Sequence, residues 1–179
     1  MIKFIKIILK GLAIFILSIA LIYLFFSIKW RLEASRDYAL FGLEAPRLKI
    51  NNKVYRDLNK NGKLDTYENP EAQIEDRVED LISQMNPYEK AGAIFIDMIG
   101  VNADGTPMEF PSFSDPFSFL METSSVQIAK KKMNHFNIRA SHPKEKMIEW
   151  QNAIQKMGER SRLGIPITIA SDPRHGVPT

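Results

Sequence analysis

The strongest hydrophobic pattern in the chain is an uncharged apolar run from Gly11 to Ile28. Lysines precede the run, and Lys29 and Arg31 follow it closely. As a helix with a rise of 1.5 Å per residue, a run of this length spans about 27 Å, close to the hydrocarbon thickness of a bilayer. The pattern therefore predicts a transmembrane helix within residues 1–30.

Two other interpretations of this run stay open. A cleaved secretory signal usually has a shorter apolar core, about 7–15 residues, with small residues at the cleavage site. No Ala-x-Ala pattern follows Phe26. A buried core helix is the third interpretation, and we favour the uncleaved anchor over both. The lysines before the run favour a cytoplasmic N-terminus. We therefore expect the chain after Trp30 on the extracytoplasmic side, periplasmic or extracellular, where a cleaved signal would also deliver it.

After a polar segment that we interpret as a linker (residues 31–54), residues 55–68 contain a calcium-type loop. Oxygen-bearing side chains occupy positions 1, 3, 5, 9 and 12 of the twelve-residue pattern, with Gly62 at position 6 for the sharp turn. Position 7 would contribute only its backbone carbonyl. The predicted metal ligands are Asp57, Asn59, Asn61, Lys63, Asp65 and Glu68.

The loop also has a simpler interpretation, an Asn- and Asp-rich turn held by side-chain-to-backbone hydrogen bonds. Asn69 and Pro70 interrupt the helix that normally leaves such a calcium loop, and suit the cap and first turn of a new helix instead. We favour a structural Ca²⁺ ion, because the twelve-residue pattern is matched in full. We expect its affinity to be weak, because only three of the ligands are charged. No cofactor for catalysis is expected.

From Pro70 onward the pattern indicates an α/β fold. Apolar residues from Ile74 to Met85 fall on one helical face, and a short helical turn is expected at Asn86 and Pro87. Residues 93–99 form a nearly continuous apolar run, typical of a parallel strand covered on both faces.

A second helix and a second strand are expected further along. The helix is predicted over residues 143–163, with Gly164 as its stop, and the strand over residues 166–170. The apolar side of this helix consists of Met147, Trp150, Ile154 and Met157. Strand, helix and strand in this order predict a parallel sheet.

Between these elements, residues 101–125 form a long loop rich in proline and phenylalanine. Loops of this length are usually functional or disordered. One phenylalanine could stack on a sugar ring, but we favour plain packing of the loop onto the domain. We interpret His135 and His142 as structural or surface residues.

Composition narrows the function classes. A chain that is 45% hydrophobic and 25% charged is typical of a folded protein. The net charge of +3 comes without a basic, aromatic-rich stripe, so nucleic acid is not an expected partner. The absence of cysteine excludes disulfides, thiolate metal sites and a cysteine nucleophile. Oligomeric state is not predicted by any of these features.

Three segments resemble, in this order, the start of the catalytic domain of family 3 glycoside hydrolases, which are β-glucosidase-like enzymes. The segments are Tyr55–Glu68, Arg77–Gly92 and Arg162–Gly176. The resemblance implies that residues 69–179 begin a (β/α)8 TIM-type barrel, whose first two strands would be about 93–99 and 166–171. It also implies a carbohydrate substrate and exo-acting, retaining hydrolysis of terminal β-linked sugars.

The same resemblance implies that Asp172 binds hydroxyl groups of the terminal sugar. Asp172 also follows a predicted buried strand, where barrel enzymes place site residues. Arg174 and His175 are candidates for orienting Asp172 or closing the pocket, although we favour a role for His175 in bracing the turn. Together these three residues form the predicted substrate site.

Retaining hydrolysis requires two carboxylates about 5–5.5 Å apart. In the family that the motifs resemble, the nucleophilic aspartate lies on a later barrel strand and the acid/base comes later still, so we assign no catalytic residue to this chain. We interpret it as an N-terminal fragment that is inactive alone. The alternatives are a membrane-tethered calcium- or carbohydrate-binding module without catalysis, and a nonfunctional remnant.

Overall fold

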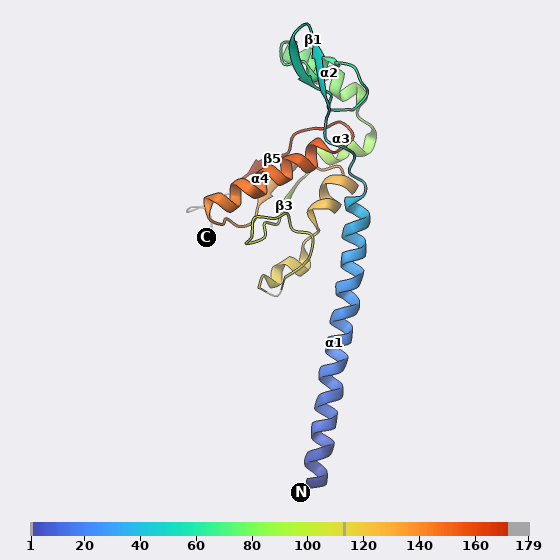
Figure 1. Cartoon of the computed structure of the whole chain (residues 1–179), viewed down its shortest axis with the longest axis vertical. Helices are drawn as coiled ribbons and strands as arrows, with labels where there is room; N and C mark the ends of the chain where they lie inside the picture. Colours follow the sequence, from blue (N-terminus) through green and yellow to red (C-terminus); the bar gives the residue numbers. More distant parts are fainter. Residues whose placement is uncertain (1, 113, 172–179) are drawn as a thin grey trace.

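The computed structural model describes residues 2–112 and 114–171. A long helix projects from a smaller α/β body, and a two-stranded hairpin lies at the opposite end of the molecule (Figure 1). The body contains a three-stranded sheet in the order β3-β4-β5. This arrangement confirms the predicted α/β class, whereas the described residues contain no closed barrel.

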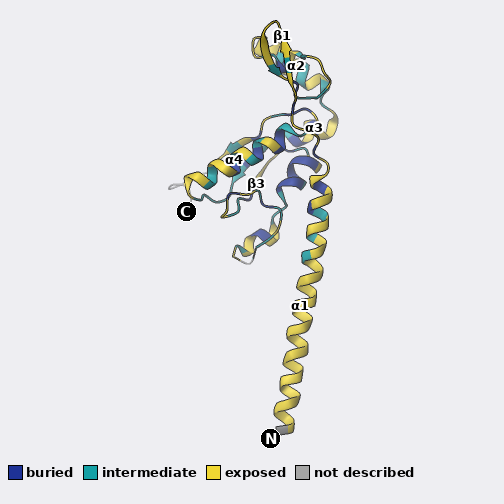
Figure 2. Cartoon of the chain, in the orientation of Figure 1, coloured by how far each residue is buried: buried dark blue, intermediate teal, exposed yellow. Residues whose placement is uncertain are grey.

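Helix α1 spans Ile2–Tyr38, well past the expected anchor. Every side chain from residue 3 to residue 26 is exposed, as Figure 2 shows for the part of α1 far from the body. This helix is long and apolar enough to cross a membrane. Its last turns bury Ala34 and Asp37 on one stripe that packs against the body. The added length therefore has a tertiary cause, because packing stabilises helix beyond the apolar run.

The segment expected to be a plain linker contains regular structure. Strands β1 (Arg47–Ile50) and β2 (Lys53–Arg56) pair in antiparallel register. Asn51 and Asn52 connect them with φ angles of 48° and 64°. Two successive positive φ angles are the mark of a type I′ turn, which asparagine tolerates well and whose twist suits a tight hairpin. The segment interpreted as a linker, residues 31–54, therefore contains the end of α1 and most of a β-hairpin.

Helix α2 spans Ile74–Gln84, so it begins four residues later than expected. The Asn69 side chain instead accepts a hydrogen bond from the Glu71 amide at 3.0 Å and stabilises a local turn around Pro70. The predicted apolar face exists, but much of it is exposed, with 69% of Ile74 accessible. Helix α2 contacts the preceding loop through polar side chains instead.

Helix α3 (Pro87–Ala93) confirms the predicted start at Asn86. The Asn86 side chain accepts from the Glu89 amide at 3.0 Å, and the Glu89 carboxylate accepts from the Asn86 amide at 2.9 Å. This reciprocal capping box satisfies two amides that the helix leaves unpaired.

The parallel sheet consists of β3 (Ile96–Ile99), β4 (His135–Ile138) and β5 (Thr168–Ala170). Strand β4 was not expected, and it lies between the two strands that were. Its sequence mixes polar and apolar residues, so only backbone pairing on both sides identifies it as a strand. The predicted neighbours therefore do not pair directly.

Helix α4 (Lys144–Glu159) covers one face of this sheet and buries Trp150, Ile154 and Met157, as predicted. It ends before Leu163, and Gly164 lies in the turn beyond it. The core behind α4 also contains Ile99, Phe136 and Ile128, the last from the short π-helical turn η3 (Val126–Lys130).

The opposite face of the sheet is open in the described structure. Ile96 and Met98 alternate with buried Ile99 along β3 and are 68% and 41% exposed. In β5, Thr168 and Ala170 lie on the same face, at the positions that pair through β4 with Ile96 and Met98, and both are exposed. Within the described residues the first strand is therefore covered on one face, and its predicted cover on the other face stays a prediction.

Candidate functional site

The carboxyl ends of β3, β4 and β5 meet at one edge of the sheet, because the three strands are parallel. This is the edge at which α/β enzymes bind their substrates. The predicted sugar-binding residues Asp172, Arg174 and His175 follow β5 in the sequence and lie outside the described residues. The described structure therefore shows the edge from which this segment leaves, up to Ser171.

A cleft of about 680 Å³ lies beside the strand ends. Its lining includes Asn102, Asp104, Phe110, Asp115, Ser118 and His142. The cleft is thus formed by the loop after β3 and by the segment after β4. Its mixture of carboxylates, hydroxyl groups and one aromatic ring suits a polyhydroxylated ligand.

Two side chains that follow β4, Arg139 and His142, hold together the segments that line the cleft. The His142 Nε2 atom lies 3.2 Å from the carbonyl oxygen of Val101, which ties the segment after β4 to the segment after β3. Arg139 forms an ion pair with Asp115, and its guanidinium carbon lies 5.1 Å from the ring centroid of Phe117. His142 is therefore structural, as predicted, and also lines the cleft.

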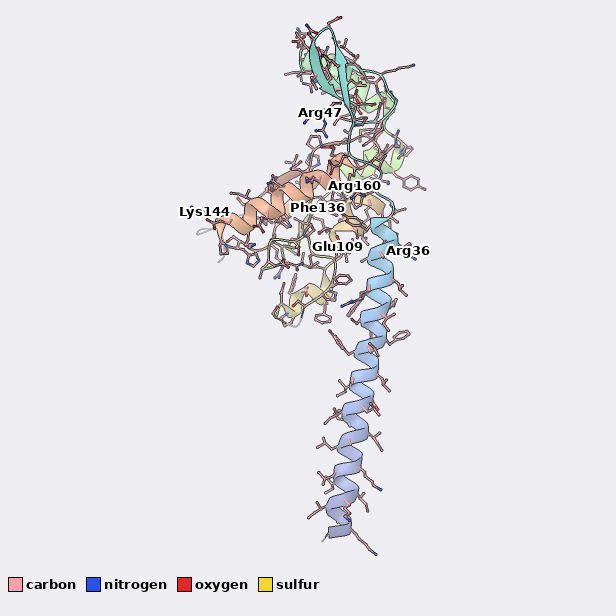
Figure 3. All side chains as sticks on the ribbon, viewed as in Figure 1. Arg36, Arg47, Glu109, Phe136, Lys144 and Arg160 are labelled. Atoms are coloured by element: carbon pink, nitrogen blue, oxygen red, sulfur yellow. The ribbon has the colours of Figure 1, made fainter. Side chains whose placement is uncertain are left out.

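Glu109 is a half-buried carboxylate that no sequence pattern indicated. Its side chain accepts hydrogen bonds from the Ser125 amide at 3.0 Å and the Ser125 hydroxyl at 2.5 Å. Burial raises the pKa of Glu109, and the nearby Asp37 raises it further, against the lowering effect of Ser125. Figure 3 shows Glu109 close to the junction of the body and α1. No residue pattern around Glu109 distinguishes it from a surface glutamate.

The predicted calcium loop is compact, and its two terminal carboxylates bind backbone amides. Asp57 is 1% exposed and accepts from the amides of Asn61 at 3.0 Å and Gly62 at 2.8 Å. Glu68 accepts from the amides of Leu58, Asn59 and Asp65. These bonds are the ones expected of the turn interpretation.

Three further predicted ligands converge on one point. The side-chain amides of Asn59 and Asn61 both donate to Asp65 Oδ2, at 2.6 Å and 2.7 Å. The Lys63 amide donates to Asn61 Oδ1 at 2.8 Å. Among the described residues, no group of three or more His, Cys, Asp or Glu side chains is placed to hold a metal ion. Calcium binding therefore stays a prediction.

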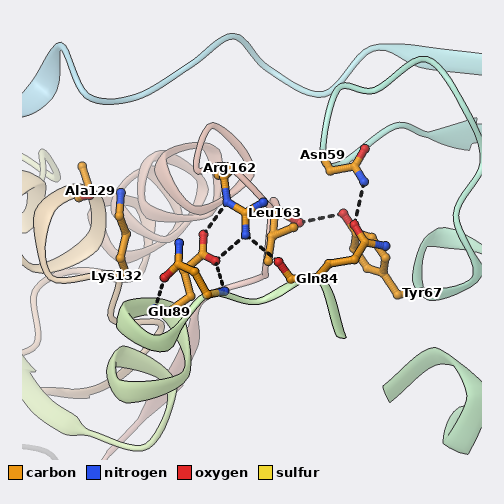
Figure 4. Close-up of polar contacts among 9 residues, drawn as sticks. Asn59, Tyr67, Gln84, Glu89, Ala129, Lys132, Arg162 and Leu163 are labelled. Atoms are coloured by element: carbon orange, nitrogen blue, oxygen red, sulfur yellow. Dashed lines mark hydrogen bonds and ion pairs between the residues drawn. The ribbon is translucent and has the colours of Figure 1, made fainter. Parts of the chain in front are cut away.

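The same loop braces the carboxyl end of α4. Lys60 Nζ donates to the carbonyl oxygens of Glu159 and Ser161, each at 2.6 Å, and burial lowers the pKa of Lys60. The Tyr67 hydroxyl donates to the carbonyl oxygen of Leu163 at 3.1 Å (Figure 4). A Cβ atom at Gly164, whose φ is +58°, would lie 2.9 Å from Leu58 Cβ. Glycine at this position therefore permits close contact between the loop and the turn before β5.

An ion pair fixes the same turn to α3. Arg162 Nε donates to Glu89 Oε1 at 2.8 Å, and a second guanidinium nitrogen contacts Glu89 Oε2 and the carbonyl oxygen of Gln84 (Figure 4). Glu89 is only 6% exposed and also caps α3. All three motif segments therefore meet around residues 159–164, which lead directly into β5.

Comparison with known proteins shows similarity to β-glucosidases. The chain is 33% identical to a periplasmic β-glucosidase/β-xylosidase of Dickeya chrysanthemi over 136 residues, which are 73% of this chain and 19% of that protein. It is 38% identical to β-glucosidase C of Emericella nidulans over 63% of this chain and 16% of the relative. A probable β-glucosidase C of Aspergillus oryzae is 32% identical over 65% of this chain and 17% of the relative.

The resemblance predicted from the three motifs is thus confirmed at the level of β-glucosidases, a class of glycoside hydrolases. The chain spans less than a fifth of the length of these curated relatives. No protein-family model matches the chain.

The Arg162–Glu89 pair predicts an acid-sensitive contribution to stability. Burial alone would raise the pKa of Glu89, but the hydrogen bonds from Arg162 and the Asn86 amide and the Arg162 charge outweigh it, so the pKa lies below its usual value of 4.5. A carboxylate with a lowered pKa stabilises the folded state above its unfolded pKa, and this contribution is lost as the pH falls through the folded pKa.

We expect Glu89→Gln to destabilise the chain by about 1–3 kcal/mol at pH 7, because a charged, buried hydrogen-bond acceptor becomes neutral. The difference from the unmodified chain should shrink below about pH 4.5. Urea unfolding in detergent micelles, followed by tryptophan fluorescence, measures both effects. Exposed Glu79→Gln is the control and should change stability little at either pH. An equal destabilisation at pH 7 and pH 3.5 would contradict the prediction.

Proposed function

We propose that this chain is the N-terminal part of an exported, retaining, exo-acting β-glycosidase of glycoside hydrolase family 3, which hydrolyses terminal β-linked sugars. The observation that carries the proposal is the similarity to β-glucosidases over most of the chain. The parallel strand ends support it, because they form the kind of edge at which such enzymes bind sugars. The same similarity to enzymes does not favour a binding module without catalysis.

In this proposal β3, β4 and β5 are the first strands of a TIM-type barrel. Parallel sheets are normally covered on both faces. The exposed apolar side chains Ile96 and Met98 are the kind that fill a barrel interior, while α4 covers the outer face. Strand β4 would then be the second barrel strand, and β5 the third.

Asp172 is the proposed sugar-binding residue. It follows β5 by two positions in the sequence, and barrel enzymes place their site residues after the carboxyl ends of their strands. An ionised carboxylate can accept hydrogen bonds from two sugar hydroxyls with charge-assisted strength. Arg174 and His175 would orient this carboxylate or close the pocket. The proposal assigns the catalytic carboxylate pair to no residue of 1–179.

Helix α1 is the proposed membrane anchor, with the body on the extracytoplasmic side. Its exposed apolar run and flanking cations support this role. The first relative described above is named as periplasmic, in agreement with an exported enzyme.

A structural Ca²⁺ ion in the Asp57–Glu68 loop is also part of the proposal. The residue types fit, because Asn59, Asn61 and Asp65 each carry a side-chain oxygen and lie within hydrogen-bond distance of one another. Rotating the two amides by 180° would present their oxygens to a cation in place of their nitrogens. The ion would then stiffen the loop that braces α4.

We expect residues 1–179 alone to show no turnover of aryl β-glucosides or β-xylosides above background, because retaining hydrolysis needs a carboxylate pair that the proposal places elsewhere. The full chain in detergent micelles is assayed with chromogenic substrates. Turnover that Asp172→Ala abolishes would contradict the fragment interpretation.

In a longer polypeptide that carries the remaining barrel strands, Asp172→Asn should lower kcat/KM. A hydrogen bond to a charged partner contributes about 1.5–3 kcal/mol, which corresponds to roughly 10- to 150-fold per bond. His175→Ala should have a milder effect if that residue braces the turn. Steady-state kinetics on one substrate decides the comparison, and an unimpaired Asp172→Asn enzyme would exclude Asp172 from sugar binding.

We expect the loop to bind Ca²⁺ with a dissociation constant on the order of 0.1–1 mM, because few of its ligands are charged. Titration calorimetry and a calcium-dependent thermal shift measure this on the full chain in micelles. Asp65→Asn should abolish both responses, and exposed Asp76→Asn should leave them unchanged. The turn interpretation would stand if folded, unmodified chain gave neither heat nor a shift.

A further inference from the structure

Helix α1 joins the body at the level where its apolar run ends. Residues 3–26 are exposed on all sides, and burial begins at Ser27. From there a stripe spaced three or four residues apart, including Trp30, Ala34 and Asp37, faces the body. If α1 crosses a bilayer through Gly11–Ile28, the lipid–water boundary lies at the point where the body begins.

The long loop that is rich in proline and phenylalanine (residues 101–125), called the aromatic loop below, lies beside α1 where the apolar run ends. The ring of Trp30 contacts Phe119, with centroids 5.6 Å apart, and also Phe26 at 5.7 Å. The Arg31 guanidinium carbon lies 5.8 Å from the ring centroid of Phe110. Figure 1 shows the loop that contains η2 (Pro116–Leu120) extending from the body alongside α1, toward the N-terminal end of the helix.

The tip of this loop exposes large apolar side chains. Leu120 is 81% exposed, and Phe117 and Phe119 are 42% and 38% exposed. Such a cluster is costly in water, but it suits the headgroup layer of a membrane, where aromatic side chains are enriched. Figure 3 shows that the side chains of α1 below this level project on all sides into space without a neighbouring element.

Charges around the loop are compatible with a membrane surface. Two acids of this region are paired, Asp115 with Arg139 and Glu122 with Lys131. The cations that follow the apolar run at the end nearest the body are Lys29 and Arg31. Anionic lipid headgroups attract such cations, and pairing reduces the repulsion that the acids would otherwise cause.

We propose that residues 114–121 form a second membrane contact, in which Phe117, Phe119 and Leu120 enter the interfacial layer of the bilayer that α1 crosses. This inference rests on the proposed membrane anchor. Phe110, Asp115 and Ser118 of the same loop line the cleft at the strand ends. The contact therefore seats the body on the bilayer and holds the cleft close to the membrane surface.

The natural chain contains no cysteine, so single labels can be placed cleanly. The full chain carries an environment-sensitive fluorophore on Leu120→Cys, on Leu17→Cys in α1, or on exposed Ile148→Cys in α4. Each is reconstituted into vesicles of phosphatidylcholine and phosphatidylglycerol that contain lipid nitroxides at a shallow or a deep position. We expect severalfold stronger shallow quenching at position 120 than at position 148, and deep quenching at position 17.

The three positions separate the two proposals. Deep quenching at 17 together with quenching at 120 as weak as at 148 overturns the loop contact and leaves the anchor intact. No deep quenching at 17 overturns the anchor itself, and the loop contact with it.

A second pair of variants tests whether the natural side chain, rather than the fluorophore, enters the bilayer. With the label on exposed Ser114→Cys, Leu120→Glu should abolish shallow quenching, because a carboxylate resists transfer into the membrane. Ile148→Glu is the matched control and should leave the quenching unchanged. Shallow quenching at 114 that survives Leu120→Glu overturns membrane insertion of the loop tip.

Discussion

The carboxyl end of α4 is the point on which the arrangement of the body depends. A helix leaves its last carbonyl oxygens without partners inside the helix. Here they bind groups from distant parts of the sequence, the Lys60 ammonium and the Gly42 amide, and the following turn binds the Tyr67 hydroxyl. Because these bonds are satisfied only in one arrangement, they fix the direction in which the chain leaves α4 and enters β5.

This constraint connects the calcium-type loop to the proposed sugar site. The loop lies far from the strand ends in sequence, yet it contacts the turn that sets the start of β5. Arg162 holds the same turn against α3 through Glu89. The direction of β5 determines where the chain emerges at the edge of the sheet. Substitutions in the calcium-type loop would therefore affect the proposed sugar site by changing the direction of β5, without contacting that site directly.

Apolar exposure in this molecule has two different forms. In α1 it extends around the whole helix, which is the pattern of a segment that lies in lipid. On α2 and on the open face of the sheet it is limited to one side, represented by Ile74, Ile96 and Met98, while the other side packs or forms hydrogen bonds. One-sided exposure is typical of a surface that another protein element covers. The aromatic loop beside Trp30 lies at the boundary between these two situations.

The sequence by itself determined the local elements whose pattern is strong. These are the apolar helix, the Asn86 cap, the buried face of α4 around Trp150 and the β-glucosidase resemblance. It did not reveal β4, because strand identity there comes from pairing with β3 and β5. Nor did it reveal which face of α2 is used, since the Asp80 carboxylate binds the Tyr67 amide at 2.8 Å and turns the polar face inward. Periodicity records which side chains share a face, whereas only tertiary contacts decide what that face meets.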